Sequence, residues 1–350
     1  MFRVAASVGP PVSFALSLFS PFTMRAFSLL SVAALAAAMP MSVEDYAESL
    51  QAAKRQVSEP QVDDFAFYVQ HAGAAYCNTE TAAGSPITCG GNCPEVEANG
   101  VYMVGTFSGS GTGIAAHVAL DPKKGEIILS VRGSSNILNW ITNINFAFKD
   151  TSLVSGGQFH TGFNNAWDEL SSGVTSAIDG ALASNSGYRV VATGHSLGGA
   201  VATIAAAHLR AGGKTVDTYT YGAPRVGNDV VSDFITNQGT NNRVTHLDDP
   251  VPRLPPIFVG YRHTSPEYWL SNGEASGEDY PPEDIKVCTG NENVDCNAST
   301  GGLNLDAHSI YFGPVSSCSA FAASSAAADD DVAKQVDDWS KQDIAFVKGE

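Results

Sequence analysis

Basic residues are scarce in this 350-residue chain. Lysine and arginine together number 19, against 36 aspartates and glutamates, and the formal net charge is −17. A nucleic-acid partner is therefore excluded, because proteins displace the counterions of a phosphate backbone with Lys and Arg. Charged residues of both signs make up only 16% of the chain and hydrophobic residues 44%, which is typical of a compact enzyme. The length suits one large α/β domain with a single core.

Cysteines are also few, and their spacings do not fit a zinc site. Neither short pair has the two-residue spacing or the neighbouring histidines of a zinc finger. The even number of cysteines predicts disulfides instead. The two short pairs are expected to close locally and to leave the outer pair for a bridge from the start of the domain to its end, where the long loop constrains the unfolded chain most. The predicted bridges are Cys77–Cys318, Cys89–Cys93 and Cys288–Cys296.

An uninterrupted hydrophobic run long enough to span a membrane is lacking as well. A spanning helix needs about 20 consecutive apolar residues, and the N-terminal stretch is interrupted at Pro10, Pro11, Ser20, Pro21 and Arg25. From Met24 the sequence MRAFSLLSVAALAAAMP has one Arg, an apolar stretch, and small residues at 36–38 where signal peptidase would cut. Residues 1–38 are therefore predicted to be a secretory signal region with Met24 as the true start, and the protein is predicted to be secreted.

Two polar segments are predicted to flank the folded domain. Residues 39–55 end in the dibasic pair Lys54-Arg55, which suits a secretory-pathway protease, and we interpret them as a pro-segment. Residues 319–350 begin with an Ala/Ser run and continue with an acidic stretch. We interpret them as a detachable tail made of a linker and a short helix. The folded domain is then expected to cover residues 56–318.

The most informative segment is YRVVATGHSLGGAVATIAAAHLR at 188–210. A largely β-branched run at 190–193 meets a GxSxG sequence centred on Ser196, and an Ala-rich helical stretch follows. This is the context of a nucleophile elbow, where a β-carbon at Gly194 or Gly198 would strike the neighbouring strand or helix. Ser196 is therefore the predicted nucleophile. The helix start supplies N–H groups and a positive dipole end where an oxyanion would form.

A serine nucleophile also needs a base to take its proton and an acid to orient that base. In folds with this elbow the chain order is Ser, acid, His. RVTHLDDPVPRLPP at 243–256 places two aspartates after a short β-like run and before a proline. The residues alone leave both Asp248 and Asp249 open as the acid.

Four histidines compete for the role of the base. His208 lies in the helix after the elbow and His246 precedes the acid, so chain order disfavours both. His263 and His308 remain, and either could instead be a hydrogen-bonded structural histidine.

Several long motifs resemble the secreted triacylglycerol lipases of filamentous fungi, the class 3 lipases. They are GHSLGGA, TYGAPRVGN at 220–228, RVTHLDDPVPRLPP, GYRHTSPEYW at 260–269 and DAHSIYFG at 306–313, and the resemblance covers roughly residues 60–318. It implies an α/β-hydrolase fold, a single domain with a central, mostly parallel sheet flanked by helices and a short helical lid. It also implies Asp249 as the acid and His308 as the base, and makes His263 structural. The resemblance also supports the predicted bridges Cys77–Cys318 and Cys89–Cys93. Some relatives carry a further Cys pair that this chain lacks.

The resemblance also assigns roles within IILSVRGSSNILNWITNINF at 127–146. It implies that Ser134, after Arg-Gly, donates to the oxyanion together with the backbone N–H of Leu197. The apolar residues that follow recur at helical spacing and by pattern alone would belong to the core. Their position directly after the oxyanion segment favours the family's lid, with Ile137, Leu138, Trp140 and Ile141 as its apolar residues.

The sequence thus predicts a secreted triacylglycerol lipase that acts on lipid esters at the oil–water interface through an acyl-enzyme. Phospholipase A1 and feruloyl esterase activities on the same fold stay open, and a non-catalytic lipid-binding module is the alternative from another class. No metal or organic cofactor, nucleic-acid partner or stable membrane span is implied, and a monomer is expected. Asn297-Ala298-Ser299 is a glycosylation sequon, expected in a surface loop.

Overall fold

The computed structural model describes residues 56–315 and 330–350, and its centre is an eight-stranded sheet. The strand order is β1-β2-β3-β6-β7-β8-β9-β10. The five strands from β3 to β9 run parallel, and antiparallel pairs close both edges. The strands are β1 Tyr102–Ser108, β2 Ala115–Asp121, β3 Glu126–Val131, β6 Arg189–His195, β7 Val216–Tyr221, β8 Asn241–His246, β9 Glu267–Leu270 and β10 Ile285–Cys288. A separate pair joins β4 Phe148–Asp150 to β5 Gln158–His160.

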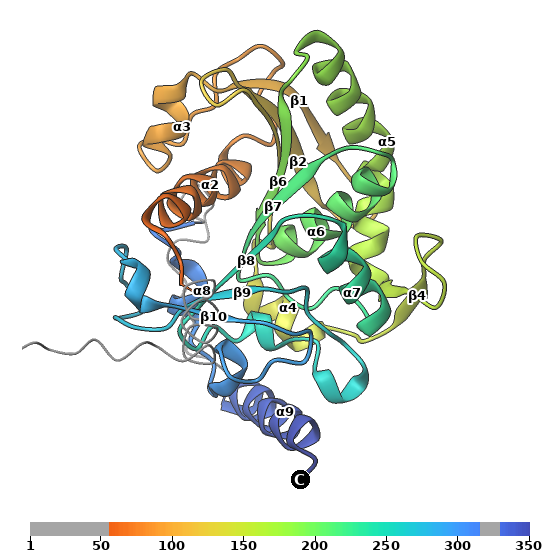
Figure 1. The fold of residues 1–350 in the computed structure, drawn as a ribbon, viewed down its shortest axis with the longest axis vertical. Coiled ribbons are helices and arrows are strands. Elements are labelled where there is room, and N and C mark those ends of the chain that lie inside the picture. The colour runs from red at the N-terminus through yellow and green to blue at the C-terminus, as the bar shows by residue number, and fades with distance from the viewer. Residues whose placement is uncertain (1–55, 316–329) are drawn as a thin grey trace, which may run out of the picture. The chain divides into compact units, whose positions relative to one another are not determined.

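Helices cover both faces of this sheet (Figure 1). α2 (Glu59–Cys77) packs on one face, whereas α5 (Thr161–Ser184), α6 (Leu197–Ala211) and α7 (Asp229–Gln238) lie on the other. Successive side chains of a strand point to opposite faces, and β3 divides accordingly. Ile127 and Leu129 pack with α5 and α6, while Ile128 packs with α2. The predicted α/β architecture is therefore present, with a core on each side of the sheet.

Shorter elements connect these layers. α3 spans Pro94–Asn99, α4 spans Ile137–Asn143 and α8 spans Leu305–Ser309, and the 3-10 helices are η1 Val251–Arg253, η2 Ile257–Val259, η3 Pro282–Asp284 and η4 Asn297–Ser299. Two of the three predicted disulfides are formed, Cys89–Cys93 and Cys288–Cys296. Cys318, the signal region and the pro-segment lie outside the described residues, so those predictions stay untested. None of the helices described here is both long and apolar enough to cross a membrane.

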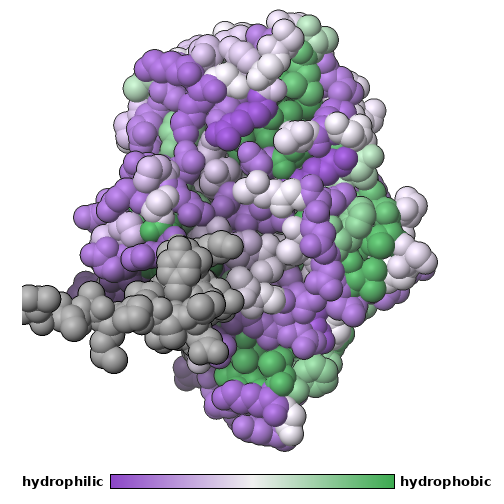
Figure 2. Space-filling model, in the orientation of Figure 1, coloured by the Kyte–Doolittle hydropathy of each residue, from purple (hydrophilic) through white to green (hydrophobic). Residues whose placement is uncertain are grey.

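The acidic tail contributes a helix that packs on the domain. α9 (Asp330–Lys348) contacts η2 and η4, and Asp343 forms a buried ion pair with Arg225, with 3.1 Å between the charged atoms. The second oxygen of Asp343 accepts a hydrogen bond from the backbone N–H of Phe258 at 3.1 Å. In Figure 2 hydrophobic residues gather where α9 adjoins the rest of the domain, whereas its outer surface is hydrophilic. Removal of the tail by processing stays a prediction.

The Arg225–Asp343 pair predicts that α9 stabilises the whole domain. Burial lowers the pKa of Arg225 to about 10, although the Asp343 charge opposes this shift. Asp343→Ala would leave the guanidinium buried without its carboxylate, so we expect it to reduce the free energy of unfolding by about 3 kcal/mol. Denaturant titration measures the change. Lys341→Ala, which removes an exposed ion pair on the same helix, is the control and should leave the midpoint unchanged. Equal midpoints for both variants would contradict the prediction.

Candidate active site

The GxSxG segment forms a tight turn between β6 and α6. Ser196 has φ 57° and ψ −132°, a backbone conformation that residues other than glycine rarely adopt. A β-carbon on Gly194 would lie 2.5 Å from the backbone of Gly198, and one on Gly198 would lie 2.1 Å from the carbonyl oxygen of Val131. Both glycines are therefore required by close backbone approach, as the sequence predicts. The turn places Ser196 at the N-terminus of α6, immediately after the carboxyl end of β6.

The structure distinguishes between the two aspartates that follow β8. Asp249 accepts hydrogen bonds from Nδ1 of His308, at 3.0 Å for Oδ1 and 2.9 Å for Oδ2. The carboxylate of Asp248 instead accepts from the side-chain amide of Asn304 at 2.7 Å. The pair of groups expected for the acid and the base is thus Asp249 and His308, brought together from the end of β8 and from α8.

Asp249 carries its charge in a fully buried position. Burial is the largest influence on its pKa and raises it. The charge of His308 and hydrogen bonds from His308, Tyr311 and the N–H of Val251 together outweigh burial, so the pKa of Asp249 lies below its ordinary value. The Tyr311 hydroxyl donates at 2.5 Å and the Val251 N–H at 2.8 Å. The carboxylate therefore stays ionised at neutral pH.

Ser196 and His308 lie on the two sides of one backbone turn. The N–H of Ser196 donates to the carbonyl oxygen of Tyr221 at 2.8 Å, and a β-carbon on the next residue, Gly222, would lie 3.1 Å from Nδ1 of His308. Within the described residues, neither the Ser196 hydroxyl nor Nε2 of His308 has a hydrogen-bond partner, although both are buried. The direct bond between them that the sequence predicts is not formed here. Such bonds are often long in unliganded enzymes.

His195, which precedes Ser196 in the elbow, supports the backbone of His308. Its Nε2 lies 2.7 Å from the carbonyl oxygen of His308, and its Nδ1 lies 3.0 Å from the hydroxyl of Tyr76. The two imidazole rings are 4.5 Å apart between centroids. Burial, followed by the proximity of His308, lowers the pKa of His195 to about 3. His195 is therefore neutral at working pH, and the sequence reasoning assigned it no part in the site.

The two predicted oxyanion donors flank Ser196. Val131 at the end of β3 pairs with Gly194 of the adjacent parallel strand, so the chain segment after β3 runs beside the elbow. A β-carbon on Gly133 would lie 3.3 Å from Cβ of Ser196, and Ser134 follows directly. Leu197 is the first residue of α6. Two backbone segments with N–H groups therefore lie next to the predicted nucleophile.

The predicted lid forms the short helix α4, capped by Asn136, whose side chain accepts from the N–H of Asn139 at 2.9 Å. Ile137 and Ile141 are buried, and Leu138 and Trp140 are partly buried. These four residues belong to one apolar cluster, here called the lid cluster, which also contains Val251, Leu254, Leu303 and Leu305 from the segments beside Asp249 and His308, and Val332, Val336 and Trp339 from α9. The apolar face of α4 is thus covered.

Two of the other histidines that competed for the base have hydrogen-bond partners elsewhere, whereas the ring of His208 packs against Phe159 and Trp167. His263 is buried, with Nε2 2.7 Å from the carbonyl oxygen of Pro252, and the sequence resemblance also made it structural. Both ring nitrogens of His246 have partners, the carbonyl oxygen of Ala307 at 2.9 Å and the hydroxyl of Tyr280 at 2.6 Å. The geometry therefore favours His308, which is one of the two histidines that chain order left open.

The surface position expected for the glycosylation sequon is wrong for Asn297. Its side chain is only 1% exposed, because η4 packs beneath the loop that carries Asp249. Its amide nitrogen donates to the carbonyl oxygens of Leu247 and Asp249, each at 3.0 Å. The sequon pattern reports only local sequence and contains no information about this burial.

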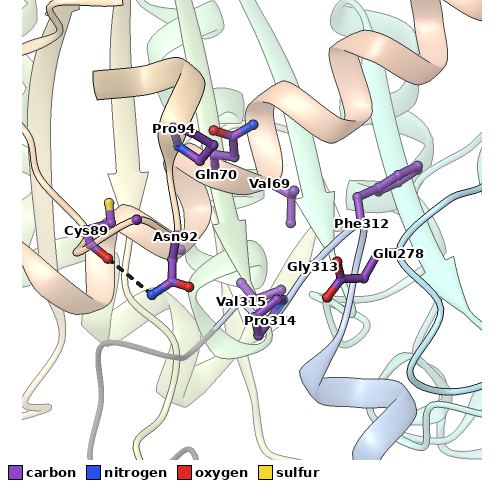
Figure 3. Close-up of a pocket in the computed structure, with 12 residues that line it drawn as sticks. Val69, Gln70, Cys89, Asn92, Pro94, Glu278, Phe312, Gly313, Pro314 and Val315 are labelled. Carbon is purple, nitrogen blue, oxygen red and sulfur yellow. Dashed lines mark hydrogen bonds between the residues drawn. The ribbon is translucent and has the colours of Figure 1, made fainter. Parts of the chain in front are cut away.

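A cavity of about 340 Å³ lies apart from these groups (Figure 3). Val69 and Gln70 of α2 line one side, and Phe312 and Val315 line another. None of its lining residues belongs to the group around Ser196 and His308. The cavity therefore takes no part in the chemistry derived below.

Comparison with known proteins identifies the family. Residues 128–259 match Lipase (class 3), and residues 25–103 match the Lipase 3 N-terminal region. The secreted mono- and diacylglycerol lipase 1 of Fusarium solani is 48% identical, over 93% of this chain and 99% of that protein. The chain belongs to the class 3 lipases.

Solved structures agree with this membership of the class 3 lipases. A mutant form of the lipase MDLA from Penicillium cyclopium is 38% identical, covers 75% of this chain and 99% of its own, and has a TM-score of 0.72. A triacylglycerol lipase described as having a serine protease triad for its catalytic centre is 29% identical, covers 76% of this chain and 99% of its own, and has a TM-score of 0.67. The fold is that of the α/β-hydrolases, and the protein is a carboxylic ester hydrolase.

The neutral His195 predicts a pH-dependent difference in stability. The imidazole has a pKa of about 3 in the fold and about 6.5 in the unfolded chain. Between these pH values the unfolded chain binds a proton at this imidazole that the folded chain does not bind. Protonation therefore lowers the free energy of unfolding, and this loss of stability is absent above about pH 6.5 and grows as the pH falls toward 3. The variant His195→Gln has no imidazole at this position and lacks this pH-dependent loss of stability. We expect its melting temperature to be below that of the wild type at pH 7.5 and to approach or exceed it at pH 4.5. Parallel melting curves across this range would disprove the linkage.

Proposed function

We propose that this secreted lipase hydrolyses acylglycerols with Ser196 as the nucleophile, His308 as the base and Asp249 as the orienting acid. The observation that carries the proposal is the buried contact between Asp249 and Nδ1 of His308. With Nδ1 bound to the carboxylate, Nε2 is the nitrogen left to take a proton, and it has no other partner within the described residues. This is the arrangement that a serine hydroxyl needs for activation.

The reaction follows from these positions. Nε2 of His308 takes the proton of Ser196 as the hydroxyl oxygen attacks the ester carbonyl, and Asp249 stabilises the imidazolium that forms. The N–H groups of Ser134 and Leu197 donate to the oxyanion, aided by the positive end of the α6 dipole. His308 then protonates the departing glycerol oxygen and leaves an acyl group on Ser196. Water, activated by the same imidazole, releases the fatty acid and restores the enzyme.

Acylglycerols are the substrate class that sequence and relatives favour together. The sequence resemblance predicts triacylglycerol, and the relatives from Fusarium solani and Penicillium cyclopium are named as mono- and diacylglycerol lipases. We propose that the protein acts as a monomer on such esters at an oil–water interface. The apolar residues of α4 support this, because a covered apolar helix can exchange its protein contacts for lipid contacts.

Replacing Ser196 tests the chemistry. Ser196→Ala should reduce hydrolysis of emulsified tri-, di- and monoacylglycerols by at least about 10⁴-fold, because the acyl-enzyme cannot form. A fluorophosphonate probe should label the wild type and not the variant. Ser172→Ala, at an exposed position of α5, is the matched control and should keep full activity. Substantial turnover by Ser196→Ala would refute the assignment. Faster hydrolysis of phosphatidylcholine or methyl ferulate than of any acylglycerol would overturn the substrate class.

The lid cluster predicts how activity depends on an interface. Val336 of α9 is 1% exposed and packs in the lid cluster, so Val336→Ala should destabilise the covered state of α4 by about 1 kcal/mol or more. We expect activity on dissolved short-chain esters to rise several-fold, while activity on emulsions changes little. Lys341→Ala on the exposed side of α9 is the control. An unchanged ratio of activities in solution and at the interface would argue against α4 as a lid.

A further inference from the structure

We infer that Asn297 is a positioning residue for the acid, a role that rests on the proposed triad. Within the described residues, Asn297 forms no hydrogen bond with His308 or Ser196. Its side-chain amide donates one hydrogen bond to the carbonyl oxygen of Leu247 and one to that of Asp249, both at 3.0 Å. The two bonds hold the backbone of the turn that carries Asp249.

The turn from Leu247 to Asp249 needs these two hydrogen bonds because its backbone is strained. Leu247 has φ 36°, in the left-handed region that costs a residue with a side chain free energy. A strained conformation persists only when surrounding contacts hold it. The carbonyl oxygen of Leu247 accepts a second bond from Trp269 at 2.8 Å, and that of Asp248 accepts from Arg253 at 3.1 Å. Asn297 is the side chain that binds both ends of this three-residue turn.

Asn297 is itself held by contacts with the sheet, so the side chain that binds the turn is fixed in position. Its backbone N–H donates to the carboxylate of Glu267 on β9 at 3.2 Å. Glu267 in turn pairs with Arg243 of β8 at 2.9 Å. The preceding residue, Cys296, is joined by a disulfide to Cys288 of β10. Asn297 is therefore held to three neighbouring strands of the sheet, β8, β9 and β10.

This role is incompatible with use of the sequon. A glycan would be attached to the same amide nitrogen that makes both bonds, and an amide has only two N–H donors there. The side chain is also 1% exposed, which leaves no room for a sugar. The functional protein therefore carries Asn297 unmodified.

The consequence for the reaction is kinetic. The carboxylate orients the imidazole, and a displacement of about 1 Å in a catalytic geometry can reduce the rate by about 10²-fold. Loss of the two Asn297 hydrogen bonds should therefore reduce kcat while KM changes little, because Asn297 binds no part of the substrate.

The experiment compares two substitutions at Asn297 with one that removes only the sequon. Asn297→Ala removes both donors, and Asn297→Asp keeps the side-chain shape while replacing the donors by an acceptor, so one variant serves if the other does not fold. On a dissolved short-chain ester we expect kcat to fall by about 10- to 100-fold, while KM stays within about twofold of the wild-type value. The kcat values are calculated from the concentration of active sites, which titration with a phosphonate gives. Ser299→Ala destroys the sequon and loses only a local bond to Cys296, and should retain the wild-type kcat.

A double-mutant cycle separates positioning from a general structural role. If Asn297 acts through the carboxylate, Asn297→Ala should add little to the loss already caused by Asp249→Ala. Full additivity, an equal loss in Ser299→Ala, or a glycan found on Asn297 by mass spectrometry would each overturn the inference. Unimpaired activity of Asp249→Ala alone would instead count against the proposed triad, so the two failures are distinguishable.

Discussion

A buried carboxylate is the constraint on which this site depends. Asp249 is fully buried and charged, and a buried charge is tolerated only when it is paired and hydrogen-bonded. Its partners come from two segments of the chain: His308 on α8 and Tyr311 just after it, and Val251 at the start of η1. Satisfying one charge therefore fixes the relative positions of His308, Asp249 and the segments around them.

Parallel strands explain why groups far apart in the sequence converge. The carboxyl ends of β3, β6 and β8 lie along the same edge of the sheet, and open α/β sheets place their sites at that edge. Gly133 and Ser134 follow β3, Ser196 follows β6, and Asp249 follows β8. Only His308 comes from outside this strand series, and His195 and Asp249 hold it by its backbone carbonyl and its ring respectively.

The C-terminal helix α9 gives α4, the proposed lid, a protein partner. In the lid cluster, side chains of α4 and α9 pack together with the segments around the acid and the base. The ion pair between Arg225 and Asp343 fixes the position of α9, and Arg253 links Ser340 of α9 to the carbonyl oxygen of Asp248. The same helix therefore packs against α4, the proposed lid, and supports the loop that carries Asp249. Uncovering the apolar face of α4 requires these apolar contacts to be replaced, which an oil surface can do and water cannot.

The sequence by itself determined the parts of this protein that depend on local rules. The elbow glycines, the strand before Ser196 and the short-range disulfides follow from spacing and from steric limits that apply wherever such a segment folds. The choice between Asp248 and Asp249, and between His263 and His308, followed from family resemblance, because neighbouring residues of the same type look alike in a sequence. The tertiary structure supplied the physical distinction between the two aspartates, by placing Asn304 against one carboxylate and His308 against the other. The burial of Asn297, the support from His195 and the docking of α9 were likewise decided by long-range contacts. A local pattern cannot report these contacts, because the partner residues lie tens to more than a hundred positions away along the chain.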